Sequence, residues 1–314
     1  MHDSQLHHLY LTITILLVIA TIIGAVLKLR VTSEKGKATV DNMNARIKAW
    51  WVMVGVFAVA NYAGLLATTL LFFLLSLGAL KEFTRLSPDD AVGVGKAQKL
   101  AFVLFTPLQY LLIVMDWYGM FALLVPVYAF LFIPTLNAIG GDAKEFLART
   151  ARLQWALMVC VYCLSHAPAI LTLQIPGYEG QNAKLLLFLV LVVQISDVLQ
   201  YAWGKTTGKR PIAPNISPNK TVEGFIGGVA SATLVGTALW WATPFNPFQA
   251  WLFALLIALA GFCGGLTMSA IKRDRGVKDF GTMIEGHGGV LDRIDSICFS
   301  APLFFHVVRY FFTL

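Results

Sequence analysis

The sequence predicts an all-α integral membrane protein with about ten transmembrane helices. Of its 314 residues, 57% are hydrophobic and 13% are charged, whereas soluble domains are about 45–50% apolar. Its mean hydropathy is +0.71. The apolar residues fall into blocks of about 17 to 25, the length that a helix needs to cross ~30 Å of hydrocarbon. These three observations exclude an ordinary soluble domain.

Eight of these blocks are each predicted to form one transmembrane helix. The first is expected to be an anchor with its N-terminus outside, because HDSQLHH before it has no Lys or Arg and no small-residue cleavage site follows it. The eight blocks are residues 9–27, 99–115, 117–139, 153–173, 185–203, 224–243, 248–271 and 297–312.

A ninth apolar run, residues 50–80, leaves two alternatives. It is too long for one ordinary span and short for two, and Asn61 and Gly64 near its middle allow a turn. If the run crosses only once, the chain has nine spans, with 8 basic residues on one side and 16 on the other. If it is a hairpin, 22 of the 24 Lys and Arg lie on one side, in loops 28–49, 81–99, 140–152, 204–223 and 272–293. Because basic loops stay in the cytoplasm, ten helices with both termini outside are favoured.

Any chemistry is expected at the cytoplasmic membrane surface, because these loops carry nearly all the ionisable groups. The net charge of +7 therefore reports topology, and nucleic acid is not expected as a partner. Four cysteines without a long polar loop give no disulfide framework. The predicted location is the inner (cytoplasmic) membrane of a bacterium.

Residues 194–228 form the first stretch of unusual polar groups. Asp197 lies inside an apolar run, where an aspartate costs on the order of 2.5–3.5 kcal/mol, so a functional role is favoured over a helix-to-helix hydrogen bond or a carboxylate that reaches water. Ser217 as N-cap and Pro218 as first helical residue predict a helix start whose free N–H groups favour an anion. Lys220 is either a phosphate contact or a topogenic charge.

Residues 269–295 form the second stretch, with five basic and five acidic residues. Mixed charge of this density suits a metal polyphosphate, because carboxylate oxygens hold a hard cation and Lys or Arg neutralises phosphate. Asp292 and Asp295 share one helix face, although the helix dipole alone also favours carboxylates in a first turn. His287 between two glycines predicts a turn that lets the backbone approach a ligand.

The residues of both stretches resemble a known family. The second stretch carries Ser269, Lys272-Arg273, Lys278-Asp279, Gly281, His287-Gly288-Gly289, Asp292-Arg293 and Asp295. This pattern resembles the signature of the phosphatidate cytidylyltransferases, also called CDP-diacylglycerol synthases. Upstream, the chain resembles the same family in the order and spacing of Asp197, Tyr201, Gly204, Gly208 and residues 217–224, SPNKTVEG.

The resemblance covers about residues 45–314, so two regions are expected. Residues 1–44 form a transmembrane anchor with a basic loop, and residues 45–314 form a membrane-embedded cytidylyltransferase domain. Two positions depart from the family pattern. Glu285 stands where Pro, Gly or Ser is usual, and Gln200 lies where small residues usually precede the Tyr. With the added first helix, they suggest a divergent paralogue with a different or narrower lipid acceptor.

The resemblance implies an enzyme, a nucleotidyltransferase that joins CTP and phosphatidate to give CDP-diacylglycerol and pyrophosphate. The implied cofactor is Mg²⁺, with a second monovalent or divalent cation as an option. Its implied ligands are Asp279 first, then Asp292, Asp295 and Asp197. The implied catalytic residues are Asp279, Lys272, Arg273, Lys278, His287, Asp292 and Arg293. The implied substrate-binding residues are Ser217, Lys220, Ser269, Gly288, Gly289 and Tyr201.

Two rival functions stay open at this point. Another CTP-dependent lipid nucleotidyl or phosphoryl transferase would act on a different lipid acceptor, and tests of CTP use and acceptor specificity would distinguish it. A secondary transporter would also have ten spans and an intramembrane Asp, but its functional charges would lie near the midplane. Close helix packing is expected at two pairs of glycines spaced four residues apart, at 224 and 228 and at 261 and 265. This packing occurs within the chain or across an expected homodimer.

Overall fold

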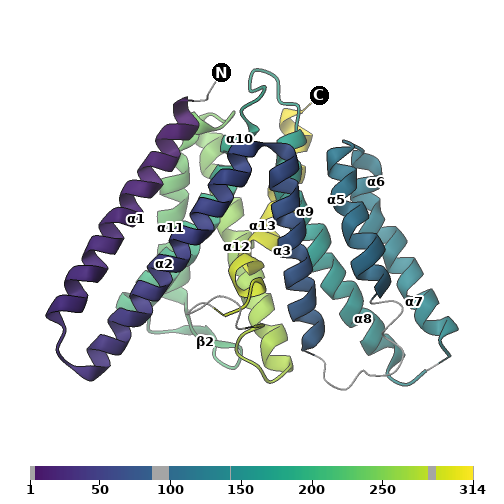
Figure 1. Cartoon of the computed structure of the whole chain (residues 1–314), viewed down its shortest axis with the longest axis horizontal. Helices are drawn as coiled ribbons and strands as arrows, with labels where there is room; N and C mark the ends of the chain where they lie inside the picture. The colour runs from purple at the N-terminus through teal and green to yellow at the C-terminus, as the bar shows by residue number, and fades with distance from the viewer. Residues whose placement is uncertain (1–3, 87–98, 142, 282–287, 314) are drawn as a thin grey trace.

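The computed structural model describes the chain except residues 1–3, 87–98, 142, 282–287 and 314. It is built almost wholly of helices (Figure 1). The first half contains α1 (Ser4–Arg30), α2 (Glu34–Ala63), α3 (Leu65–Arg85), η1 (Ala101–Phe105), α5 (Thr106–Val114), α6 (Tyr118–Leu123), η2 (Leu124–Ala129) and α7 (Phe130–Ile139). The second half contains α8 (Phe146–Leu157), η3 (Met158–Cys163), α9 (Leu164–Ala169), η4 (Ile170–Thr172), α10 (Asn182–Thr207), β1 (Pro211–Ala213), β2 (Ser217–Thr221), α11 (Val222–Ala238), η5 (Trp240–Ala242), α12 (Pro247–Asp274) and α13 (Leu291–Phe312).

The chain is a polytopic membrane protein. Within the described residues, six helical segments are long and apolar enough to span a bilayer, namely Ser4–Arg30, Leu65–Arg85, Tyr118–Ile139, Phe146–Thr172, Asn182–Thr207 and Pro247–Asp274. Ala101–Val114 and Val222–Ala238 are shorter apolar helices. Large apolar side chains face outward, as on α1, where Leu16 is 61% exposed and Ile22 is 57% exposed. Hydrocarbon, rather than water, is the solvent that suits such a surface.

The ambiguous run at residues 50–80 is broken into two helices at Gly64. α2 ends at Ala63 and α3 begins at Leu65, and Gly64 has a φ of 89° that favours glycine. Figure 1 shows α2 and α3 meeting there as a hairpin. Nearby, Asn61 donates hydrogen bonds to the Tyr10 hydroxyl (2.9 Å) and to the Ala183 carbonyl (3.1 Å), which ties α2 to α1 and α10. How many helices cross a bilayer stays a prediction.

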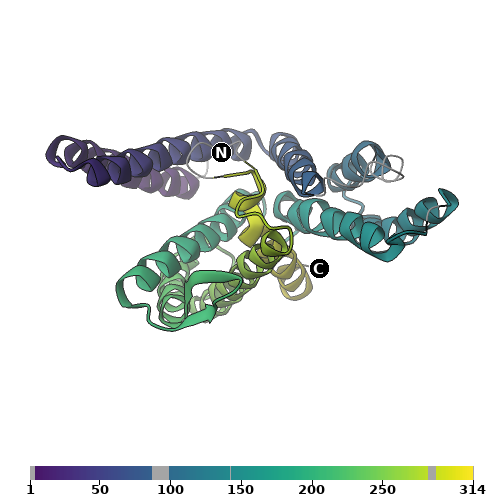
Figure 2. The same ribbon diagram turned by 90° about the horizontal axis from the view of Figure 1, so that it is seen from below.

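Both chain ends lie at the same end of the helix bundle, at the top of Figure 1. We call the opposite end, where α3, α10 and α12 finish, the charged end. Figure 2 looks from that side and shows α10 to α13 grouped with the two-stranded sheet, whereas α1 and α2 extend away as a pair. β1 and β2 pair antiparallel, with Pro211 opposite Thr221.

Glycines let α11 approach α10 closely. A Cβ at position 228 would lie 2.5 Å from the Gln200 Cα, and one at position 224 would lie 2.8 Å from the Gly204 Cα. The Gly224–Gly228 spacing therefore serves packing within the chain. The main core includes fully buried Leu185 and Leu189 on α10 and Phe304 on α13.

Replacing Gly228 with Ala should destabilise the bundle, because the added methyl group would meet the α10 backbone. We expect Gly228→Ala to lower the free energy of unfolding by about 1–3 kcal/mol, measured as thermal unfolding in detergent. Gly55→Ala is the matched control, because nothing lies within 4 Å of a Cβ there. Equal unfolding temperatures for both variants would contradict the close approach of α10 and α11.

Candidate active site

A pocket of about 310 Å³ lies between α10, β2, α11, α12 and α13. Its walls come from segments that are far apart in the chain. They bring together seven of the residues that the sequence analysis selected: Asp197, Tyr201, Ser217, Lys220, Ser269, Asp292 and Asp295. We call this cavity the carboxylate pocket.

Two carboxylates and one lysine form the charged centre of the carboxylate pocket. Asp197 on α10 has Asp295, Lys220 and Arg293 as its charged neighbours. Asp295 on α13 also faces Lys272. Burial lowers the pKa of Lys220, and the nearby carboxylates of Asp295 and Asp197 partly oppose that shift. The pocket therefore holds negative oxygens and cationic groups together in partly dehydrated surroundings.

Gly265 provides the space for the Lys220 side chain. A Cβ at position 265 would lie 2.8 Å from the Lys220 Nζ. That Nζ also lies 5.1 Å from the centre of the Phe262 ring, within the range of a cation–π contact. Both residues are on α12, so this helix fixes the position of the lysine. The glycine pair at 261 and 265 thus serves the pocket as well as helix packing.

Asp292 connects α12, the following loop and the start of α13. Its Oδ1 accepts a hydrogen bond from the Lys272 Nζ at 2.7 Å, in an ion pair whose side chains are only 13% and 4% exposed. Its Oδ2 accepts bonds from the backbone N–H groups of Phe280 and Gly289, both at 2.9 Å. These bonds occupy most of its lone pairs, so Asp292 is built mainly to shape the loop.

Glu82 is a site residue that the sequence analysis missed. It projects from α3, is 6% exposed, and accepts hydrogen bonds from the N–H groups of Val290 (3.0 Å) and Leu291 (2.9 Å). These are two of the donors that the beginning of a helix leaves without intrahelical partners. Glu82 thereby caps α13 from a position more than two hundred residues away.

Glu82 also explains two glycines of the signature. A Cβ at position 281 would lie 2.6 Å from the Glu82 carboxylate, and one at position 289 would overlap it. Only glycine lets the loop fold around this buried acid. The sequence analysis placed Glu82 in the loop 81–99, whereas α3 extends to Arg85. The only available signal was an acid at the end of an apolar span.

The expectation that Ser217 caps a helix was wrong. Ser217 lies in β2, and α11 begins at Val222 with Thr221 as its N-cap. The Thr221 hydroxyl accepts from the Gly224 N–H at 3.1 Å, and Glu223 in the first turn accepts from the N–H groups of Lys209 and Arg210. Pairing with β1 holds residues 217–221 extended, so the helix starts four residues later than predicted.

The remaining predicted residues lie around the carboxylate pocket or beyond the described part of the chain. The Arg273 Nε donates to the Ile216 carbonyl at 3.2 Å, which joins α12 to the turn of the sheet. Asp279 and Lys278 are exposed on the loop after α12, and Asp279 lies next to Gly288, whose φ is 84°. The Nε of Arg293 is buried and has no hydrogen-bond partner among the described residues. His287 and Glu285 lie outside the described residues.

The donors of the carboxylate pocket fit a magnesium ion that is shared with a substrate. In the part of the chain that the structure describes, no group of three or more His, Cys, Asp or Glu residues is placed to hold a metal. Asp197 and Asp295 nevertheless face one pocket that the Ser217 and Ser296 side chains also line. Mg²⁺ is commonly held by one or two carboxylates together with substrate phosphates, rather than by an all-protein cage.

Comparison with known proteins decides the family. The family model of the cytidylyltransferases matches residues 44–311. The chain belongs to the cytidylyltransferase family. It is therefore an enzyme of the nucleotidyltransferase class, and the family predicted from its sequence is confirmed.

Individual relatives agree with this assignment. The phosphatidate cytidylyltransferase of Helicobacter pylori strain 26695 is 34% identical over 231 residues, which cover 70% of this cytidylyltransferase and 79% of the relative. That of Staphylococcus aureus strain COL is 32% identical over 194 residues, 59% of this chain and 74% of the relative. The Escherichia coli K12 protein called uncharacterized protein YnbB is 39% identical over 303 residues, 95% of this chain and 97% of the relative.

Removing one acceptor oxygen of Glu82 should loosen the start of α13. In Glu82→Gln, an amide NH₂ replaces one oxygen that now accepts from a backbone N–H, so we expect a loss of about 1–3 kcal/mol in the free energy of unfolding. Hydrogen exchange at Val290 and Leu291 should accelerate as well. Glu34→Gln, at an exposed first-turn position, is the control. Unchanged exchange in Glu82→Gln would contradict the proposed cap.

Proposed function

We propose that this cytidylyltransferase transfers CMP from CTP to phosphatidate, giving CDP-diacylglycerol and pyrophosphate. The observation that carries the proposal is the carboxylate pocket, where Asp197, Asp295 and the half-buried Lys220 from three separate segments face one cavity. Such a combination suits a nucleoside triphosphate with a bound cation. The names of the Staphylococcus and Helicobacter relatives support phosphatidate as the acceptor.

Cationic side chains around the pocket would hold the phosphates. Lys220 lines the cavity, and Lys272 lies next to it through its ion pair with Asp292. Arg293 has a buried Nε without a partner among the described residues, so an incoming phosphate oxygen would satisfy it.

The reaction needs no nucleophile from the protein. An ionised oxygen of the lipid phosphate attacks the α-phosphorus of CTP, and the bond from that phosphorus to the bridging oxygen of the β-phosphate breaks, so that pyrophosphate leaves. The main barrier is the approach of two anions. The chain's own contribution is to orient both phosphates and to neutralise their charge through Lys220, Lys272 and Arg293.

Asp197 and Asp295 are the metal ligands that this geometry favours. When bound, Mg²⁺ would polarise phosphate oxygens and offset the charge that develops on the leaving group. Asp292 contributes less to a metal, because its oxygens already accept three hydrogen bonds. Asp279 stays a candidate on the loop beside Gly288. A second cation remains an option.

One observation favours a second candidate, transfer to another lipid acceptor. Gln200, where the chain departs from the family pattern, lines the carboxylate pocket, and its amide donates to the Ser196 hydroxyl at 2.8 Å. A polar side chain there could select a different headgroup. We therefore propose phosphatidate as the first acceptor to test, with other phosphorylated lipids next.

The membrane setting completes the proposal. The charged end would face the cytoplasm of a bacterial inner membrane, where CTP is available, and ten helices would cross the bilayer. A homodimer is also part of the proposal, and chemical crosslinking of the purified protein would test it.

The proposal is tested by following CMP-linked lipid formed from α-labelled CTP and phosphatidate, with and without Mg²⁺. We expect Mg²⁺-dependent product, and Asp295→Asn should lower turnover by about a hundredfold or more, because it weakens a metal ligand. Asp279→Asn, run in parallel, tests the loop carboxylate. The control is Asp41→Asn, whose carboxylate pairs with Lys28 on the surface. Normal turnover in Asp295→Asn would refute the assigned site.

Lys220 should matter for nucleotide binding more than for folding. We expect Lys220→Met to weaken CTP binding by about ten- to a hundredfold, because a charged hydrogen bond to phosphate is lost. Lys209→Met, at an exposed position, is the control. Equilibrium binding of CTP measures the effect, and equal affinity in both variants would exclude Lys220 from the triphosphate site.

A further inference from the structure

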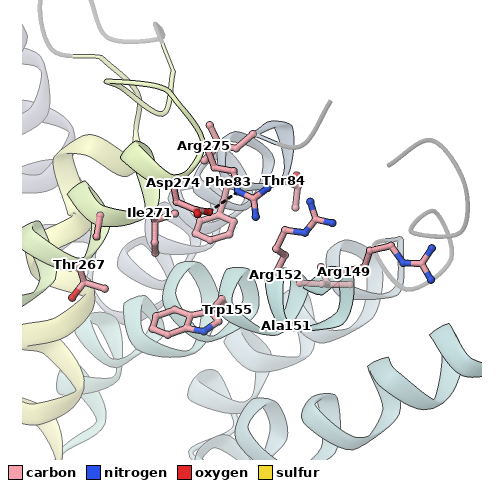
Figure 3. Close-up of a pocket in the computed structure, with 13 residues that line it drawn as sticks. Phe83, Thr84, Arg149, Ala151, Arg152, Trp155, Thr267, Ile271, Asp274 and Arg275 are labelled. Carbon is pink, nitrogen blue, oxygen red and sulfur yellow. Dashed lines mark ion pairs between the residues drawn. The ribbon is translucent and has the colours of Figure 1, made fainter. Parts of the chain in front are cut away.

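A second cavity, of about 360 Å³, lies between α3, α8 and α12 (Figure 3). Its lining combines a charged rim with an apolar floor. The charged residues are Arg149 and Arg152 on α8, and Asp274 and Arg275 at the end of α12. The apolar floor includes Phe83, Leu153, Trp155 and Ile271. We call it the arginine cavity.

The arginine cavity is separate from the carboxylate pocket. Gly265 and Ser269 on α12 line the carboxylate pocket, whereas Thr267, Ala270, Ile271 and Asp274 line the arginine cavity. At 3.6 residues per turn, these two sets lie on opposite faces of the helix. α12 therefore lies between the two cavities and separates a ligand in one from a ligand in the other.

The charge of the arginine cavity favours an anion. Among the described lining residues, three are arginines and one carries a carboxylate, that of Asp274, which lies 3.2 Å from the Arg275 Nε. The Arg152 Nε also donates to the Ala148 carbonyl at 3.2 Å. Figure 3 shows Arg149 and Arg152 projecting from α8 and Arg275 from the end of α12. Arginine forks match the oxygens of a phosphate group in geometry as well as in charge.

An adjoining apolar cavity makes the site amphipathic. This second space, of about 270 Å³, shares Ala151 and Trp155 with the arginine cavity and is otherwise lined by α7, η2, α8 and η3. Val125, Ile133 and Leu157 are among its walls. Because α8 begins at the charged end, residues further along it lie deeper in the membrane. Charged groups therefore come first and apolar walls follow along the same helix.

We propose that the two adjoining cavities form one site for an anionic glycerophospholipid of the surrounding membrane. Its phosphate would lie at Arg152 and Arg275, with Arg149 further out on α8, and an acyl chain would pass Ala151 and Trp155 into the apolar cavity. A soluble phosphate compound would use only the first part of this path. Basic pockets between transmembrane helices are known to suit lipid headgroups. This site does not depend on which lipid accepts CMP.

The test uses the full chain in detergent and fluorescent phosphatidylglycerol, whose phosphodiester cannot replace the terminal phosphate of phosphatidate as acceptor. Phosphatidylcholine with the same acyl chains, a zwitterion without net charge, is the comparison. We expect the wild type to prefer phosphatidylglycerol, and the double variant Arg152→Gln/Arg275→Gln to bind it about tenfold or more weakly. Arg30→Gln/Arg46→Gln removes two exposed arginines from α1 and α2 and should keep wild-type affinity.

A second variant tests the path of the acyl chain. Ala151→Phe fills the junction of the two cavities without changing charge, so it should weaken both labelled lipids. Excess sn-glycerol 3-phosphate should fail to displace phosphatidylglycerol, because it has no acyl chain. CTP binding should stay unchanged in every variant, which separates this site from the catalytic one.

Three outcomes would overturn the proposal. The first is wild-type affinity for phosphatidylglycerol in Arg152→Gln/Arg275→Gln. The second is wild-type affinity in Ala151→Phe. The third is displacement by sn-glycerol 3-phosphate as effective as displacement by unlabelled phosphatidylglycerol, which would assign the cavity to a soluble phosphate compound.

Discussion

A helix that begins inside an apolar bundle must find acceptors for its first backbone N–H groups, and the site depends on how α13 meets this constraint. Glu82 from α3 accepts from Val290 and Leu291, and Asp292 accepts from Gly289 and Phe280. Two buried carboxylates thus satisfy four donors. Both are also packed against glycines. The start of α13 is thereby held to α3 and α12, and Asp295 lies near Asp197.

The same arrangement creates the charge pattern that the chemistry needs. Asp292 neutralises Lys272, and Lys220 lies between α12 and the carboxylates of Asp197 and Asp295. Oxygens for a cation and the Lys220 ammonium group for phosphates therefore lie in one cavity that is partly shielded from bulk water, where their fields are stronger than in solution. Two glycines make this arrangement possible. Gly265 leaves room for the Lys220 side chain, and Gly228 lets α11 pack closely against α10.

Much of the fold and of the pocket could be predicted from the sequence, because apolar length and charge position are local signals. Asp197 stood out as an acid within an apolar run, and it does face Lys220 and Asp295. Glu82 could not be predicted, since its partners lie more than two hundred residues away and nothing local distinguishes it from a loop charge. The helix start was placed at Ser217 because serine followed by proline is a good cap, but pairing with β1 outweighed that preference. The position of Asp279 could not be predicted either. It is exposed and lies outside the lining of the carboxylate pocket, and its place depends on distant residues, Glu82 and Asp292, that hold the segments near it.

The central claim is that the carboxylate pocket is where this cytidylyltransferase holds its nucleotide. An experimental structure with Mg²⁺ and a non-hydrolysable CTP analogue tests it most directly. The account predicts triphosphate density within hydrogen-bond distance of Lys220, with the metal between the phosphates and the carboxylates of Asp197 and Asp295. Density for the triphosphate in the arginine cavity, or on the loop beyond Asp279 without contact to Lys220, would contradict it.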